Sequence, residues 1–163
     1  MKKKIFLSSN QLEFEKERRE IKNFIENDPM YNNYFEVFIF EDTPANGTFP
    51  QKVYLDKVRE SDVYIGLIGE NYGNINENGI SATEQEFDEF TKGKNKANTL
   101  MFILEDIKRD KNTDKFIEKA RNFTYSKFTR RNLEDKIKKS LYNYTTKHKI
   151  LIHPEFDQRI VFD

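Results

Sequence analysis

The chain has 163 residues, of which 28 are basic and 28 acidic, and it contains no cysteine. The zero net charge gives no overall field that would favour nucleic acid or a membrane surface, and the lack of cysteine excludes disulfides, thiolate metal sites and cysteine nucleophiles. The start, MKKKIFLSSN, has too short an apolar run for a signal peptide or a membrane span, so a cytoplasmic protein is expected.

Four short apolar runs, at 4–9, 35–40, 62–69 and 99–104, have the β-branched or aromatic character of buried strands. The segments between consecutive runs are too long for hairpins and long enough for crossover helices, so the strands should be parallel. Helical periodicity and strand-like alternation place the remaining elements, in chain order, as helices 11–27, 50–60 and 81–93, a helix containing Phe116, Ile117 and Ala120, a strand at 123–128 and a helix at 132–148.

Strands that alternate with helices predict an α/β fold, a flavodoxin-like three-layer αβα sandwich on a five-stranded parallel sheet in the order 2-1-3-4-5. We expect one domain over residues 1–149, with 150–163 as a tail or a linker to a further domain. In such sheets, ligands bind beyond the carboxyl ends of the strands where the winding reverses. The candidate site therefore follows Leu7 in the first strand and Ile68 in the third.

The loop after the first strand, SSNQ at 8–11, offers two hydroxyls at the start of a helix. Because the first amides of a helix are free and its amino end is positive, Ser8 and Ser9 could help bind a phosphate or a ribose. Alternatively, one serine simply caps the helix. The charged side chains of this helix, Arg18 among them, are expected on its solvated face, with an anion as the other possible partner of Arg18.

The loop after the third strand, 69–79, is rich in glycine and asparagine and has no periodicity of its own. Loops of this length within a compact domain are usually functional or mobile. Gly69 and Gly73 would let a ligand approach the backbone closely. Tyr72 could stack on a base or pack down as a lid over the sheet edge.

The stretch GISATEQEF opens the next helix and contains two glutamates. Ser81 and Glu84 have the spacing of a capping box, which gives Glu84 a structural role. Glu86 lies beside Thr83 and Phe90 on the helical wheel, at the margin of the buried face. Partial burial there would raise its pKa and suit it to acid, base or nucleophilic chemistry, although an outward salt bridge is the alternative.

The blocks KKIFLSSNQLEFEKERREI, SDVYIGLIGENYG and GISATEQEF resemble, in order and spacing, the signature blocks of the domain of unknown function 4062 family. The resemblance implies the N-terminal module of a larger regulatory protein. Near the end, the HPEFD segment resembles the junction at which some members continue into an AlbA-like DNA-binding domain. Nucleic acid would then be bound only through that further domain.

More distantly, the pattern is similar to TIR domains and nucleoside deoxyribosyltransferases, in which a glutamate three residues after a small polar residue acts on an N-glycosidic bond. Thr83 and Glu86 match this spacing. The similarity implies Glu86 as the catalytic residue, with candidate ligand contacts at Ser8, Ser9, Gly69, Ser81 and Thr83.

The sequence thus predicts a nucleotide-recognition domain, a sensor or effector, that binds a nucleotide or an NAD-like molecule and could hydrolyse its N-glycosidic bond. The alternative is a non-catalytic signalling domain that self-associates. A weaker alternative is nucleic-acid binding through residues 105–163, which carry 15 Lys or Arg against 10 Asp or Glu. No cofactor or metal is expected, because the two histidines, His148 and His153, lack metal-ligand spacing.

Overall fold

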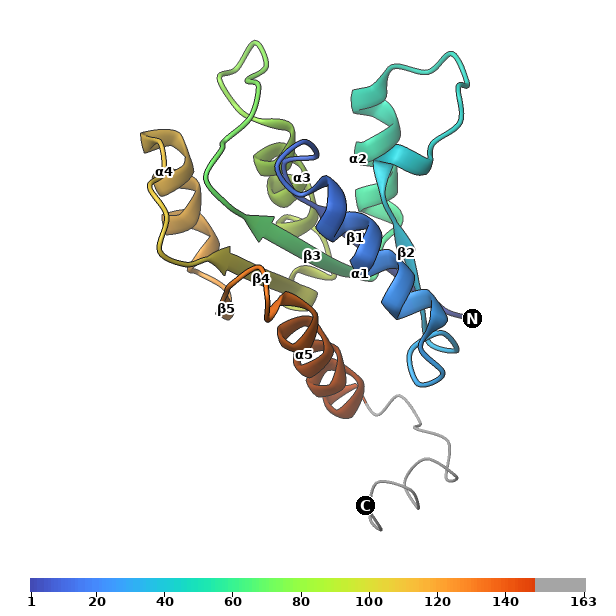
Figure 1. Cartoon of the computed structure of the whole chain (residues 1–163). Coiled ribbons are helices and arrows are strands. Elements are labelled where there is room, and N and C mark those ends of the chain that lie inside the picture. The colour runs from blue at the N-terminus through green and yellow to red at the C-terminus, as the bar shows by residue number, and fades with distance from the viewer. Residues whose placement is uncertain (149–163) are drawn as a thin grey trace.

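A computed structural model describes residues 1–148, so the expected tail at 150–163 lies outside the described residues. Five strands form one parallel sheet in the order β2-β1-β3-β4-β5, as predicted (Figure 1). In the central register, Ile5 pairs with Val37 on one side and with Val63 on the other. The strands are β1 (Lys3–Ser8), β2 (Phe35–Phe38), β3 (Val63–Ile68), β4 (Thr99–Leu104) and β5 (Tyr125–Phe128).

The helices form two layers on the sheet, α1 and α5 against one face and α2, α3 and α4 against the other (Figure 1). The α-helices are α1 (Glu15–Asn27), α2 (Pro50–Glu60), α3 (Ala82–Thr91), α4 (Lys111–Ala120) and α5 (Leu133–Lys147), and the 3-10 helices are η1 (Phe40–Asp42) and η2 (Lys96–Asn98). Among residues 1–148, no helix combines the length and the apolar character needed to cross a bilayer. The strand order and the two layers of helices confirm the predicted flavodoxin-like sandwich.

Two predicted boundaries beside the candidate site are wrong, and the strand predicted at 123–128 also starts later, at Tyr125. The helix predicted at 11–27 begins later, at the start of α1, because turns precede it and the Asn10 Oδ1 accepts the N–H groups of Leu12 and Glu13, both at 3.1 Å. The strand predicted at 35–40 ends early, where the chain tightens into η1. Local side-chain hydrogen bonds of this kind compete with regular structure.

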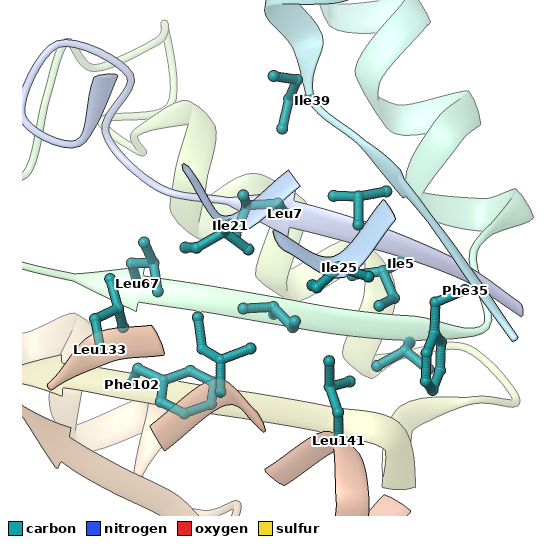
Figure 2. Packing of buried hydrophobic residues seen from close by; sticks show 14 of the residues in the cluster. Ile5, Leu7, Ile21, Ile25, Phe35, Ile39, Leu67, Phe102, Leu133 and Leu141 are labelled. Atoms are coloured by element: carbon teal, nitrogen blue, oxygen red, sulfur yellow. The ribbon is translucent and has the colours of Figure 1, made fainter. Parts of the chain in front are cut away.

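Each face of the sheet has its own core. In the first core, the buried faces of α1 and α5 pack on the strands. Its side chains labelled in Figure 2 include Ile5, Leu7, Ile21, Ile25, Leu67, Phe102, Leu133 and Leu141. The second is richer in aromatic rings and includes Phe6, Tyr64, Phe87, Phe90 and Phe116. All six residues of β3 are buried because helices cover both of its faces.

Candidate functional site

A cleft of about 280 Å³ opens at the carboxyl edge of the sheet, where the chain leaves β1 and β3. This is the point at which the winding of the sheet reverses, as the strand order requires. Most of the predicted site residues come together around it. Its lining consists of Ser9, Asn10, Gln11, Leu12, Tyr72, Gly73, Asn74, Ser81, Ala82, Thr83 and Glu86.

Glu86 lines the cleft, and the residue as a whole is 7% exposed. Ser8, at the end of β1, donates a hydrogen bond to its Oε2. Burial raises the pKa of Glu86 from 4.5 to about 7, although the Ser8 hydrogen bond and the charge of Arg18 act to lower it. Near neutral pH, both protonation states are therefore populated, which suits a group that exchanges protons or stabilises positive charge.

The alternative expectation for Glu86, an outward salt bridge, is not met. Within residues 1–148, no cationic group lies within ion-pairing distance of its carboxylate. The reason lies in the position of Glu86 on α3, between the solvent-exposed face and the buried Phe87 and Phe90. The Glu86 side chain points toward β1, where its partner is the Ser8 hydroxyl and not a cation.

The Arg18 side chain is 2% exposed, so its predicted place on the solvated face of α1 is wrong. Its Nε and Nη2 donate to the two carboxylate oxygens of Glu41 in η1, both at 2.7 Å, and its Nη1 donates to the Ser9 hydroxyl at 2.9 Å. Burial alone would raise the pKa of Glu41, but these hydrogen bonds from Arg18 hold it below its usual value. A signal for this burial exists in the sequence, because Arg18 continues the apolar stripe of Phe14 and Ile21.

Ser8 and Ser9 are both buried, at 1% and 5% exposure, and each hydroxyl already serves a charged side chain. Ser8 orients Glu86, while Ser9 accepts from Arg18 and lines the cleft. Neither serine caps α1, whose capping position is Phe14, and Asn10 binds the amides that precede the helix. The Ser8 hydroxyl thus positions Glu86 and the Ser9 hydroxyl holds Arg18, so both are used within the protein.

In the loop after β3, Tyr72 has packed down, the second of its two predicted arrangements. Its side chain is 8% exposed and its hydroxyl donates to Glu84. Gly73, at φ +92°, occupies a conformation that favours glycine, and it lines the cleft. Gly69 does not line the cleft, since a Cβ there would meet the Phe14 ring at 2.6 Å.

The start of α3 forms half of the expected capping box. The Ser81 hydroxyl accepts the N–H of Glu84 at 3.2 Å. The Glu84 carboxylate does not reach back; it accepts from the Tyr72 hydroxyl and from the Lys119 ammonium, the latter at 2.7 Å. A cation brought close by α4 is a stronger partner than a neutral amide, which explains the difference.

The other side chains that line the cleft are uncharged, and they include the apolar Leu12 and Ala82 as well as polar groups. Asn10, Asn74 and Thr83 offer amide and hydroxyl groups, and the carbonyl of Thr83 accepts from the Tyr64 hydroxyl at 3.5 Å. Throughout residues 1–148, no three acidic or histidine side chains gather in a way that could hold a metal ion. Glu86 is therefore the one ionisable carboxyl group that the cleft presents.

The comparisons with known proteins give a family and no activity. A family model described as domain of unknown function (DUF4062) matches residues 4–153, nearly the whole chain. No curated protein matches it.

Proposed function

The chain belongs to the domain of unknown function family DUF4062, and we propose that it is a nucleotide-recognition domain that hydrolyses an N-glycosidic bond. The supporting observation is the position of Glu86, a residue that is 7% exposed and lines the cleft where such sheets bind ligands. Of the acidic side chains in residues 1–148, it is the only one that is buried.

The size of the cleft limits what it can enclose. Its volume of about 280 Å³ lies near the lower end of small-molecule sites, roughly 300–1,000 Å³. One nucleoside is of this order, so the rest of a nucleotide or of an NAD-like molecule would extend into solvent. The hydroxyls and amides of Ser9, Asn10 and Thr83 suit a sugar or a base edge.

Glu86 has two roles in the proposed reaction. Its ionised carboxylate accepts hydrogen bonds from ribose hydroxyls, and it stabilises the positive charge that develops at C1′ as the glycosidic bond breaks. Because the group is buried, this interaction is stronger than it would be in water. The Ser8 hydrogen bond fixes the carboxylate in place for it, so Ser8 is a positioning residue.

The alternative is a non-catalytic signalling domain that self-associates, and a separate observation favours it. Three large apolar side chains are exposed on loops that follow β1, β2 and β3, at the same edge of the sheet: Leu12 at 90%, Phe49 at 83% and Ile75 at 58%. A mass that rises with concentration, and that falls back when Phe49 and Ile75 are replaced by serine, would support this alternative.

The test is to incubate the purified chain with NAD, NADP, ATP and deoxynucleosides, and to follow the released base by chromatography with mass detection. We expect release by the wild type and a loss of about 100-fold or more in Glu86→Gln. Glu118→Gln removes an exposed carboxylate from α4 by the same chemical change and is the matched control.

A Glu86→Gln protein that cleaves as fast as the wild type would refute the catalytic proposal. If no base is released but a ligand raises the melting temperature, the domain is a sensor. If neither effect occurs, the self-association alternative stands.

A further inference from the structure

The charges around the cleft narrow the class of ligand, an inference that rests on the proposed function. We infer that the cleft takes a phosphate-free nucleoside whose base carries a positive charge, as in an N-ribosyl pyridinium. Negative charge at the cleft would disfavour a phosphate and favour a cationic base.

The lining of the cleft contains one charged side chain, Glu86, and no lysine or arginine. Phosphate sites are usually built from arginine, lysine or free backbone amides. Arg18, which contacts Ser9 beside the cleft, donates its three side-chain hydrogen bonds to Glu41 and Ser9. These hydrogen bonds are all made within the protein, so the Arg18 guanidinium is not directed at a ligand.

The two segments that contain the cleft lining, followed into the first turns of α1 and α3, carry more acids than bases. Residues 9–19 and 69–86 contain three bases, Lys16, Arg18 and Arg19, and seven acids: Glu13, Glu15, Glu17, Glu70, Glu77, Glu84 and Glu86. Two of the acids have cationic partners elsewhere, since Glu17 pairs with Arg130 and Glu84 with Lys119. The three bases are likewise paired with acids outside these segments, Glu20, Glu41 and Asp42. Negative charge still exceeds positive charge, so the field at the cleft repels phosphate and attracts a cation.

The amino end of α3 carries a partial positive charge at the cleft, but neighbouring carboxylates offset that charge. A helix start carries a partial charge of about +0.5. The Ser81 hydroxyl already accepts the Glu84 N–H there, and the carboxylates of Glu84 and Glu86 belong to the first two turns. The helix start does not compensate for the missing cations.

The chemistry of the leaving group points to the same class. A neutral purine must gain a proton as it leaves. The Tyr72 hydroxyl is engaged by Glu84, so among the described residues that line the cleft only Glu86 could supply that proton, and its ionised form, which the proposed reaction uses, could not. A pyridinium needs no proton. The C1′–N bond breaks, both of its electrons pass to the ring nitrogen, and the base departs neutral.

Water completes the reaction. Its oxygen forms a bond to C1′, and its proton passes to the Glu86 carboxylate and then to solvent. The products are ribose, the neutral base and one proton, so charge and atoms balance. In this reaction Glu86 acts only in its ionised form, so the reaction needs no second acidic group in the cleft.

The experiment compares nicotinamide riboside, its 5′-monophosphate and inosine as substrates of the full chain. At about 0.05 M salt we expect kcat/KM for the riboside to exceed that for the monophosphate by at least about fivefold, because a phosphate meets uncompensated negative charge. The ratio should shrink at about 0.5 M salt, where exposed charges are screened. Inosine should react more slowly than the riboside.

A charge introduced at the rim provides the matched comparison. Gln11→Lys places a cation on an exposed cleft position and should shift the preference toward the monophosphate. Asn33→Lys adds the same charge on an exposed position before β2, at the opposite edge of the sheet, and should leave the preference unchanged.

Each outcome separates the two proposals. If the wild type cleaves the monophosphate as well as the riboside at low salt, or better, the inference about charge is overturned while the N-glycosidase proposal stands. If no base is released from any of the three and none raises the melting temperature, the proposed function fails and the inference fails with it.

Discussion

Replacing Glu86 with glutamine should stabilise the folded chain at alkaline pH. Residue Glu86 is 7% exposed, and burial raises the pKa of its carboxyl group from 4.5 to about 7. Ionising it in the folded state therefore costs free energy that ionising it in the unfolded state does not. Glutamine has the same shape and can accept the Ser8 hydrogen bond, but it never carries the charge.

The sign follows from proton binding. Between pH 4.5 and about 7, the folded state holds a proton on Glu86 that the unfolded state has released, so stability falls as pH rises through this window. At 1.36 kcal/mol per pH unit of difference, the full effect is about 3 kcal/mol, reached above pH 7. Below pH 4.5 both states are protonated and the effect vanishes.

The assay is urea denaturation of wild type and Glu86→Gln at pH 5 and pH 8, with the free energy of unfolding extrapolated to water. The stability of the variant relative to the wild type should increase by about 2 kcal/mol or more between these pH values, since most of the window lies between them. Glu118→Gln, at an exposed position of α4, controls for the loss of a carboxylate. A relative stability of Glu86→Gln that is the same at both pH values would refute the buried, raised pKa.

Three further predictions concern the site and its support. If the ionised form of Glu86 acts, the cleavage rate should rise with pH to a plateau above about 7, and a flat profile from pH 5.5 to 8.5 would contradict this. Arg18→Met should lower the free energy of unfolding by about 3 kcal/mol, because it leaves the Glu41 carboxylate unpaired; urea denaturation measures this, and a loss below about 1 kcal/mol would contradict it. Gly66→Ala should cost about 1–3 kcal/mol, since its Cβ would lie 2.8 Å from Cε1 of the buried Tyr64 ring; thermal unfolding measures this, and an unchanged melting temperature would count against the packing around β3.

Much of the architecture could be predicted because its signals are local. β4 coincides with the predicted run at 99–104, and β3 lies within the run at 62–69, since buried central strands are continuous apolar stretches between turn residues. The strand order followed from alternation with helices and from right-handed crossovers. The shortened β2 was not predictable in the same way, because the turn into η1 depends on hydrogen bonds that composition does not show.

The candidate site was predictable in part. Glu86 could be singled out because the phase of α3 places it beside Phe90, and burial follows from that phase. Arg18 has an equally clear phase on α1, between Phe14 and Ile21, but its charge suggested a solvated position. A buried arginine becomes acceptable only when a carboxylate such as that of Glu41 meets it, and helical phase does not reveal that partner.

The sequence by itself determined the elements, the parallel sheet and the side of α3 that carries Glu86, because periodicity is a property of neighbouring residues. The tertiary structure alone decided which partner each polar group has. Ser8 and Glu86 are 78 residues apart in the chain, and Lys119 and Glu84 are 35 apart. Such pairs form because packing on the sheet brings distant groups together out of water, where an unmet donor or charge is costly and the nearest suitable partner is selected.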